Sequence, residues 1–545
     1  MRFSNRRFIS ITIVLFVLSF IQISSSAIAK WTKSTSQTYA GLVADSDSIY
    51  TVTASGTVFR FSKSGGSQLW TSEVMGSVFV SPLIHRGYLY VGSSEGIFAL
   101  DKNDGKVIGK YITAPQKVLT VPIVNYNRLF IVAESKVFIF DISSDPAGLS
   151  QPRIVNLNGN SDSSAFAYGN GIGLFLTDGR LVHVGPTGSA ETIFNLGRTV
   201  WKAEPKLKDD VIYFGSGRRL YALSTAGSIK WYRDFNGWVS PPEVFDDRIY
   251  VGAKDGRLYV LNITGGVIGE FVTGDAVRTP YITGRTIYIP SEDNNIYAVD
   301  ISTLEQKWNM TLDDWPSQPV ISDSVLYTVS FNGTVYAAST LGCEILEPQA
   351  DAKVAPKAFL SGVGYSDSGL KSVEVRIGDG PWVIARLSEG KWEIEYTIKG
   401  QSEGSRLIAQ CRATDDTGTE IEPYNSKQLI YVSSETSLPS IILSYPTSVV
   451  GGEWFVVDFK DEAGNPLKNV LLTYAGEDYL AENGSVKIIA VEGETALYAS
   501  KPNYKTEVVT IQVVRPSLMQ YAIPIGAVAV VIIIITVLFL TKRWR

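Results

Sequence analysis

Few side chains in this 545-residue sequence have the types and spacing that catalysis or metal binding would require. The two histidines, His85 and His183, lie far apart in the chain, and neither has a second ligand at metal-binding spacing. Residues 101–105, Asp-Lys-Asn-Asp-Gly, have the composition of a calcium loop but fall one residue short of its spacing. No set of residues for nucleophilic catalysis and no glycine-rich phosphate loop is visible. We therefore predict no catalytic and no metal-binding residue, and interpret residues 101–105 as a plain turn.

The two ends of the chain predict its location. Residues 1–29 combine a basic start, an apolar stretch and small residues ending at Ala29, which predicts a cleavable secretory signal, with an uncleaved anchor as the alternative. Residues 520–540 predict a transmembrane helix, because 521–540 are uncharged over the thickness of a bilayer. The basic residues of 541–545 predict a cytoplasmic tail. We therefore expect a single-pass type I protein of the cell membrane with an extracellular ectodomain.

Charge excludes one class of partner for this ectodomain. The formal net charge is −5, and each end contributes three positive charges, which leaves about −11 for the part between them. An acidic ectodomain lacks the basic surface that nucleic-acid binding requires, so we predict no nucleic-acid partner. Four Asn-X-Ser/Thr triplets also lie in this part, and a host with the machinery could glycosylate them: Asn262, Asn309, Asn332 and Asn483.

The elements that would position any site follow a repeat of roughly 40 residues between residues 30 and 340. Each repeat contains phrases such as IYVGAKDGRLYVL (249–261), which predict two strands joined by a turn. Four strands in each of eight units predict an all-β, eight-bladed β-propeller over residues 30–341. An open or seven-bladed ring is the alternative. The last unit lacks its fourth strand, and residues 30–36, KWTKSTS, match the fourth-strand segments of other units, so we expect them to close the ring.

The repeat also resembles a known family. The phrases IYVGAKDGRLYVLNITGGVIGEF (249–271) and LYALSTAGSIKW (220–231) resemble the pyrroloquinoline quinone (PQQ) type of repeat over about 310 residues. Relatives include quinoprotein alcohol dehydrogenases, sensor modules and an outer-membrane assembly lipoprotein. In the quinoprotein dehydrogenases that this repeat resembles, a quinone and Ca²⁺ lie on the propeller axis, beside two adjacent cysteines. This sequence has no adjacent cysteines. We therefore expect no cofactor.

Aromatic residues recur shortly before the first strand of several repeats. In propellers of this kind the connections that carry them run along one face, and such a face suits a peptide segment or a glycan. Packing between blades, as we expect for the repeat tryptophans, is the alternative. The candidate binding residues are Phe79, Trp201, Trp238, Arg278 and Trp315.

Two further domains are predicted after the repeats. In 342–433, the phrases SVEVRIGDGPW and CRATDDTG resemble Ig-like β-sandwich domains of bacterial and archaeal surface proteins. Such a sandwich could bring Cys343 and Cys411 together in a disulfide, with two buried thiols as the alternative. In 434–516, the phrase DEAGNPLKNVLLTY is similar to carboxypeptidase regulatory-like, transthyretin-type β-sandwiches, which have no catalytic residues.

This organisation is similar to that of archaeal surface proteins. It favours a non-enzymatic, membrane-anchored recognition or scaffold protein that binds a protein or polysaccharide through the propeller face. The first alternative is a membrane-anchored PQQ- and calcium-dependent oxidoreductase. The second alternative is an envelope-assembly scaffold like the lipoprotein relative, although residues 20–35 contain no cysteine for a lipid anchor.

Overall fold

The computed structural model describes residues 25–26, 29–143, 149–421, 426–434, 437–493 and 496–514, which divide into two compact units. The first unit runs to Gly342 and also includes residues 365–371 and 413–421. These two segments fall in the range 342–433 that the sequence assigned to one separate domain. The remaining residues from Cys343 onward form the second unit.

Every named element in the described ranges is a β-strand. Within those ranges, no helix is both long enough and apolar enough to cross a membrane. The predicted transmembrane segment 520–540, the tail 541–545 and the signal sequence up to residue 24 lie outside the described residues.

The first unit consists of sheets of four antiparallel strands, most of them consecutive in sequence. In chain order the sheets are β3 (Val43–Ala44), β4 (Ser48–Val52), β5 (Thr57–Ser62) and β6 (Gln68–Glu73); β7 (Leu83–His85), β8 (Tyr88–Gly92), β9 (Gly96–Asp101) and β10 (Val107–Ile112); β11 (Ile123–Asn125), β12 (Arg128–Ala133), β13 (Lys136–Asp141) and β14 (Arg153–Asn156); β15 (Phe166–Tyr168), β16 (Gly171–Phe175), β17 (Arg180–Val184) and β18 (Ala190–Asn195); β19 (Lys206–Lys208), β20 (Val211–Ser216), β21 (Arg219–Ser224) and β22 (Ile229–Asp234); β23 (Glu243–Phe245), β24 (Arg248–Ala253), β25 (Arg257–Asn262) and β26 (Val267–Val272); β27 (Tyr281–Thr283), β28 (Thr286–Pro290), β29 (Asn295–Asp300) and β30 (Gln306–Thr311); and β31 (Val320–Ser322), β32 (Val325–Val329), β33 (Thr334–Ser339) and β2 (Ala29–Ser34).

The outermost strand of the last sheet comes from the other end of the unit. β2 pairs antiparallel with β33, with Trp31 opposite Ala337 and Ser34 opposite Thr334. A two-residue strand, β1 (Ser25–Ser26), pairs in parallel with β30, although the sequence places it inside the predicted signal. Strands from both ends of the unit therefore complete one sheet. As a result, the last sheet of the ring has four paired strands like the others.

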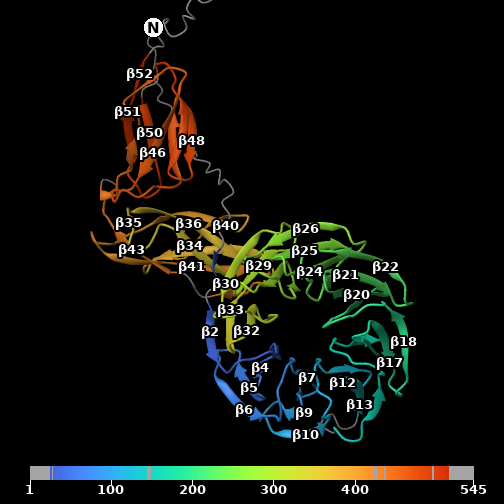
Figure 1. The fold of residues 1–545 in the computed structure, drawn as a ribbon. Coiled ribbons are helices and arrows are strands. Elements are labelled where there is room, and N and C mark those ends of the chain that lie inside the picture. Colours follow the sequence, from blue (N-terminus) through green and yellow to red (C-terminus); the bar gives the residue numbers. More distant parts are fainter. Residues whose placement is uncertain are drawn as a thin grey trace, which may run out of the picture. The chain divides into compact units, whose positions relative to one another are not determined.

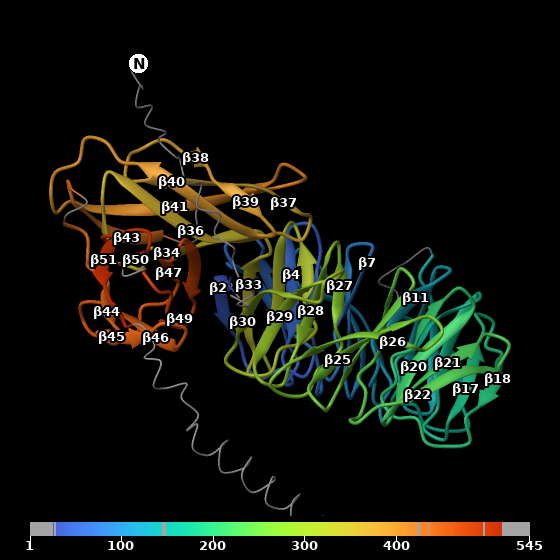
Figure 2. The ribbon, with the colours of Figure 1, turned by 90° about the horizontal axis from the view of Figure 1, so that it is seen from above.

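The sheets close into a ring because each shares an apolar core with both neighbours. One core joins the first sheet to the second through residues such as Tyr50 and Leu89, and another joins the last sheet to the first through Tyr327 and Ile49. Similar cores lie between all the other neighbours. The first strands of the last and first sheets, β31 and β3, also contact each other. Figure 1 looks onto this ring and Figure 2 shows it from the side; the first unit is a β-propeller.

Repeat tryptophans fasten neighbouring sheets to each other. Trp31, Trp70 and Trp231 each lie on an outer strand and donate the indole N–H to a carbonyl oxygen 32 residues later, at 3.1, 3.0 and 2.8 Å. Each ring covers a glycine with positive φ in the next sheet. At Gly105, for example, an added Cβ would lie 2.7 Å from the Trp70 ring. At these three junctions, one indole therefore lies over a turn of the following sheet.

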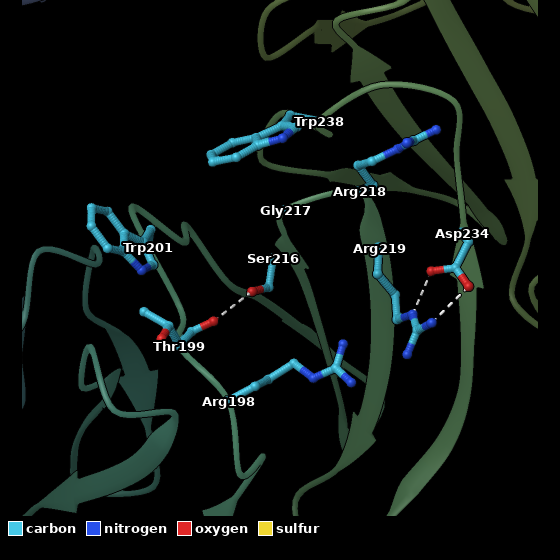
Figure 3. A pocket seen from close by; sticks show the side chains of 9 residues that line it. All are labelled: Arg198, Thr199, Trp201, Ser216, Gly217, Arg218, Arg219, Asp234 and Trp238. Atoms are coloured by element: carbon cyan, nitrogen blue, oxygen red, sulfur yellow. Dashed lines mark hydrogen bonds and ion pairs between the residues drawn. The ribbon is translucent and has the colours of Figure 1, made fainter.

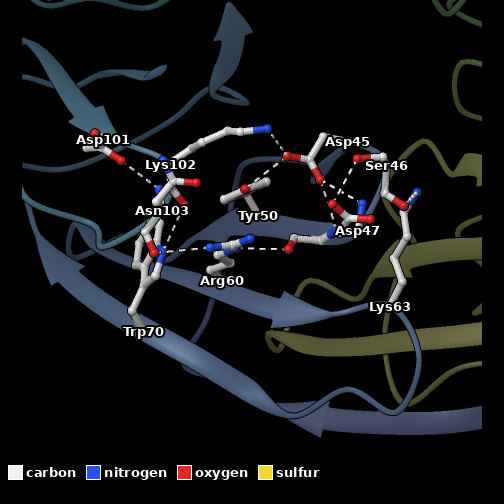
Figure 4. Close-up of polar contacts among 11 residues, drawn as sticks. Asp45, Ser46, Asp47, Tyr50, Arg60, Lys63, Trp70, Asp101, Lys102 and Asn103 are labelled. Atoms are coloured by element: carbon white, nitrogen blue, oxygen red, sulfur yellow. Dashed lines mark hydrogen bonds and ion pairs between the residues drawn. The ribbon is translucent and has the colours of Figure 1, made fainter. Parts of the chain in front are cut away.

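A partly buried ionic contact reinforces the junction of the first two sheets (Figure 4). Lys102 places its Nζ 2.8 Å from a carboxylate oxygen of Asp45, and the hydroxyl of Tyr50 donates to the same oxygen at 3.0 Å. Burial alone would raise the pKa of Asp45, but these hydrogen bonds and those from two backbone N–H groups lower it to about 2. Residues 101–105 form the turn that carries Lys102, and the Asp101 side chain accepts a bond from the Asn103 N–H at 2.7 Å. These residues thus form the turn that connects β9 to β10.

The second unit, described by itself, is also built of packed sheets. Its strands are β34 (Gly342–Glu347), β36 (Lys357–Tyr365), β40 (Lys391–Thr397) and β39 (Arg386–Ser388); β35 (Lys353–Val354), β43 (Ser426–Tyr431), β41 (Arg406–Asp415), β37 (Leu370–Ile377) and β38 (Val383–Ile384); β44 (Ile442–Ser444), β46 (Trp454–Lys460) and β49 (Ser485–Ile489); β45 (Ser448–Val450) and β52 (Gln512–Val514); and β48 (Glu477–Ala481), β47 (Val470–Tyr474), β50 (Ala496–Ser500) and β51 (Glu507–Thr510). The short strand β42 (Glu420–Ile421) pairs with Ala413 and Thr414 inside the segment 413–421 of the first unit. A disulfide between Cys343 on β34 and Cys411 on β41 joins the first two of these sheets. Further along the chain, β46 and β47 face each other across a second core that includes Phe455 and Leu472.

Candidate functional site

One face of the ring carries all the connections between successive sheets. Because the strands of each sheet alternate in direction, the turn between its second and third strands opens on the same face as the connection to the next sheet. A pairing between Val239 and Ala253 shows this directly, since it places the β22–β23 connection beside the β24–β25 turn. We call this side of the propeller the connection face. All five candidate binding residues predicted from the sequence lie on connections of this face.

A pocket of about 390 Å³ opens on the connection face between the fourth, fifth and sixth sheets (Figure 3). Trp201 comes from the β18–β19 connection and Trp238 from the β22–β23 connection, and the turn Ser216–Gly217 lies between them. The Ser216 hydroxyl donates a hydrogen bond to the Thr199 carbonyl at 3.1 Å, which joins the β20–β21 turn to the β18–β19 connection. The two indoles are 63% and 60% exposed, which is far more than the repeat tryptophans that pack between sheets. Packing therefore does not account for them.

Three arginines give the pocket a positive charge. Arg219 is held by an ion pair with Asp234 at 2.5 Å and lies over the Tyr232 ring at 4.1 Å. Among the residues that the structure describes, the Arg218 guanidinium makes one hydrogen bond, from its Nε to the Phe235 carbonyl at 3.1 Å. No hydrogen bond or ion pair joins the Arg198 guanidinium to the residues that the structure describes, and this side chain extends toward Arg219 (Figure 3).

The pKa of the Asp234 carboxyl group reflects the positive charges around it. It is lowered, first by the hydrogen bonds from Arg219; burial opposes this change, and the charges of Arg219, Arg198 and Arg218 lower the pKa further. The carboxylate therefore stays ionised and neutralises one of the three guanidinium groups. The pocket retains an excess of positive charge in a chain whose net charge is negative.

The other candidate residues form a second group, which we call the aromatic row. Tyr39 stacks on Phe79 at 6.1 Å and meets the edge of Phe331 at 5.2 Å. Phe331 in turn lies 6.1 Å from Trp315, and the Arg278 guanidinium lies over that indole at 5.5 Å. The row runs across the first, second, seventh and eighth sheets, and its Arg278 also pairs with Glu292 at 3.3 Å. The structure thus divides the predicted residues into two groups, Trp201 with Trp238, and Phe79 with Trp315 and Arg278.

Several residues of these groups were not found from the sequence. Arg198 lies on the same connection as Trp201, whereas Arg218, Tyr39 and Phe331 lie on other turns or connections. One signal was present for the arginines: the β20–β21 turn reads Ser-Gly-Arg-Arg, whereas the corresponding turn of the next repeat reads Lys-Asp-Gly-Arg. Arg218 stands where the next repeat has an ordinary turn residue, and a replacement of this kind indicates a binding role rather than a role in the fold.

The quinone and calcium of the dehydrogenase relatives would lie on the propeller axis, beside the side chains at the inner ends of the sheets. The Glu243 carboxylate accepts from Lys206 at 2.7 Å and from the Gln318 amide at 3.3 Å. Burial raises the pKa of a second carboxyl here, Glu204, on which the charges of Lys206 and Glu243 act in opposite directions. Calcium requires six to eight oxygen ligands, and these two carboxyl groups, which share a lysine, do not supply them. Across the described ranges, no three His, Cys, Asp or Glu side chains converge in a way that could hold a metal ion.

The two histidines occupy separate sheets. His85 ends β7, where burial and the neighbouring Arg86 lower its pKa. His183 lies in β17, with its ring edge against Tyr168 at 5.2 Å and its Nδ1 3.5 Å from Glu191.

The glycosylation candidates differ in accessibility. Asn332 and Asn483 are exposed on turns, Asn262 accepts hydrogen bonds within the β25–β26 turn, and Asn309 is half-buried in β30.

Comparisons with known proteins agree with this fold. A family profile described as outer membrane protein assembly factor BamB matches residues 56–192, 177–268 and 270–419. Over 94 residues the chain is 32% identical to the outer membrane protein assembly factor BamB of Salmonella typhimurium, which covers 17% of this chain and 24% of that protein. The matched stretch therefore spans about a quarter of that relative.

Solved structures resemble the chain over its propeller. Sqt1 of Saccharomyces cerevisiae superposes with a TM-score of 0.51 at 12% identity, covering 58% of this chain and 99% of that one. BamB of Moraxella catarrhalis gives a TM-score of 0.47 at 15% identity, covering 57% and 99%. At these identities the likeness to Sqt1 concerns the fold alone. Because the family matches together cover more than half of the chain, this protein belongs to the family of the outer membrane protein assembly factor BamB.

Proposed function

We propose that this protein is a non-enzymatic scaffold of the cell surface that binds a protein partner through the connection face of its propeller. The observation that carries the proposal is the exposed pair Trp201 and Trp238 beside arginines whose guanidinium groups are not all used internally. Tryptophan and arginine are the residue types that contribute most to protein interfaces. The aromatic row adds a second contact region on the same face. The family name describes an assembly factor, and a scaffold role is in keeping with it.

The proposal includes a particular architecture for presenting this face. In it, the sheets of the first unit are the blades of an eight-bladed propeller closed by residues 30–36, followed by an Ig-like and a transthyretin-type β-sandwich. Residues 520–540 anchor the chain in the cell membrane as a type I protein, and the ectodomain is extracellular. The disulfide between Cys343 and Cys411 is in keeping with an oxidising compartment.

Site-specific photo-crosslinking in the host cell tests this function. A photoreactive amino acid at Thr199, beside the pocket, and another at Tyr39, in the aromatic row, are each expected to give a discrete adduct with a protein. The same probe at Arg86, on the turn between β7 and β8 of the opposite face, provides the matched control. Adducts at Arg86 alone, or at none of the three positions, would refute binding through the connection face.

A second measurement separates the scaffold from the oxidoreductase. The full-length chain is titrated with pyrroloquinoline quinone in millimolar Ca²⁺ while its thermal melting is followed, with EDTA as the control. A ligand at a hundred times its dissociation constant stabilises a protein by about 2.7 kcal/mol. We expect no shift, and a shift that depends on both quinone and calcium would contradict the non-enzymatic proposal.

A further inference from the structure

We infer that the Trp201–Trp238 pocket binds a carboxylate side chain of an acidic, aromatic-containing peptide segment of the partner. This inference rests on the proposed function and specifies the chemistry that the connection face recognises. It is drawn from the balance of hydrogen-bond donors and acceptors in the pocket, from its charge and from its two exposed indoles.

The polar groups of the pocket are mostly donors. Arg198 has its whole guanidinium available among the described residues, and Arg218 has its terminal nitrogens, because only its Nε is used. The single carboxylate, Asp234, is taken by Arg219 through two hydrogen bonds of 2.5 and 2.7 Å. The Ser216 hydroxyl gives its proton to the Thr199 carbonyl.

This balance selects the ligand. A neutral sugar presents hydroxyl groups that each donate as well as accept, and few acceptors remain here to receive them. A carboxylate only accepts, and a planar guanidinium can bind both of its oxygens at once. The pocket is therefore complementary to an anion that offers acceptors and no donors.

The indoles favour a peptide as the carrier of this anion. Trp201 and Trp238 come from different connections and stand on either side of the Ser216–Gly217 turn, so each presents its own apolar surface (Figure 3). A peptide with alternating acidic and aromatic side chains could place a ring on an indole while a carboxylate reaches Arg198. An added Cβ at Gly217 would meet no atom within 4 Å, so a backbone can approach the turn closely.

The test uses the full-length chain and a fluorescein-labelled peptide of four Glu-Phe pairs, with binding followed by anisotropy. The matched peptide of four Gln-Phe pairs keeps the aromatic rings and removes the charge. We expect the Glu-Phe peptide to bind at least tenfold more tightly than the Gln-Phe peptide. Equal binding of the two peptides would overturn the assignment of a carboxylate.

Variants locate the binding on the protein. Arg198→Gln is expected to weaken binding about tenfold, which is the loss of one charge-assisted hydrogen-bond pair. Arg198→Lys keeps the charge but loses the planar guanidinium, so its affinity for the Glu-Phe peptide is expected to lie between those of Arg198→Gln and the unmodified protein. Lys110→Gln removes the same charge from an exposed position on the outer strand β10 and should change binding less than twofold. Trp201→Ala should weaken both peptides alike. Full binding by Arg198→Gln would overturn the inference.

An oligosaccharide of six uronate residues serves as the competing class of ligand. If it binds more tightly than the Glu-Phe peptide and depends equally on Arg198, the peptide assignment is wrong and the pocket is a site for acidic glycans. Failure of this inference is distinguishable from failure of the proposed function, because photo-crosslinking at Tyr39 would still report a partner on the connection face.

Discussion

Replacement of Asp45 by asparagine is expected to lower the melting temperature of the first unit by about 3 °C at neutral pH. Asp45 links the first two sheets, and its side chain is only 13% exposed where it meets Lys102. In the variant, Lys102 and Tyr50 lose their charged acceptor but keep their positions, so the change removes one interaction rather than a piece of core.

The magnitude follows from the pKa of this carboxyl group. Its pKa is lowered from 3.8 to about 2 in the folded protein. A difference of this size corresponds to about 2 kcal/mol of folding free energy at pH 7. Unfolding entropy is about 2 cal/mol/K per residue, so a ring of roughly 310 residues converts this energy into about 3 °C.

The sign of the pH dependence is fixed by the direction of the shift. A carboxyl whose pKa is lower in the folded state stabilises the protein above its unfolded pKa of 3.8, and the contribution is lost as pH falls through about 2. The difference in melting temperature between the unmodified protein and Asp45→Asn should therefore shrink to about half by pH 3.

Differential scanning calorimetry of the full-length chain at pH 7 and pH 3 measures both quantities. Asp47→Asn is the matched control, because Asp47 lies in the same turn but is exposed, and in the described part of the chain its carboxylate accepts a hydrogen bond from the neighbouring Ser46 alone. A difference that stays the same at both pH values, or an equal loss in the control, would refute the electrostatic reasoning.

Three further outcomes are expected. Replacing Cys343 and Cys411 by serine opens a loop with a sequence separation of 68 and should lower the unfolding free energy of the second unit by about 4 kcal/mol, measured by denaturant titration and matched by adding reductant to the unmodified protein. Gly105→Ala should destabilise the first unit by about 2 kcal/mol more than Gly87→Ala, because both have positive φ but only the former places a Cβ against an indole; equal melting temperatures would contradict this. Trp231→Phe should cost about 1 kcal/mol through the lost hydrogen bond to the Ile263 carbonyl, whereas Trp201→Phe should leave the melting temperature unchanged.

The repeat made much of the propeller predictable from the sequence. Alternating apolar residues and turn glycines specify strands locally, and the spacing of residues such as Trp70 and Trp231 reflects contacts between neighbouring sheets. Local patterns repeated along a chain are therefore enough to define a scaffold of this type.

The site was predictable only in part, because it is assembled from segments that no local pattern connects. Trp201 and Trp238 were found since both precede a first strand, but Arg218 belongs to a hairpin turn between them in the chain. Whether two such residues face one pocket depends on the curvature of the ring, which a single sequence does not encode in any short motif. Similarly, Phe331 joins Tyr39 only because the last sheet meets the first.

The pairing of β2 with β33 has a consequence for the order of folding. When the N-terminal strand leaves the ribosome, its partner lies some 300 residues away and has not been synthesised. The sheets in between can form as they emerge, since each pairs strands that are adjacent in sequence. The ring, however, cannot close until residues 334–339 have been synthesised. β2 is thus made early but paired last, and until then two unpaired strand edges are open to aggregation or to a chaperone.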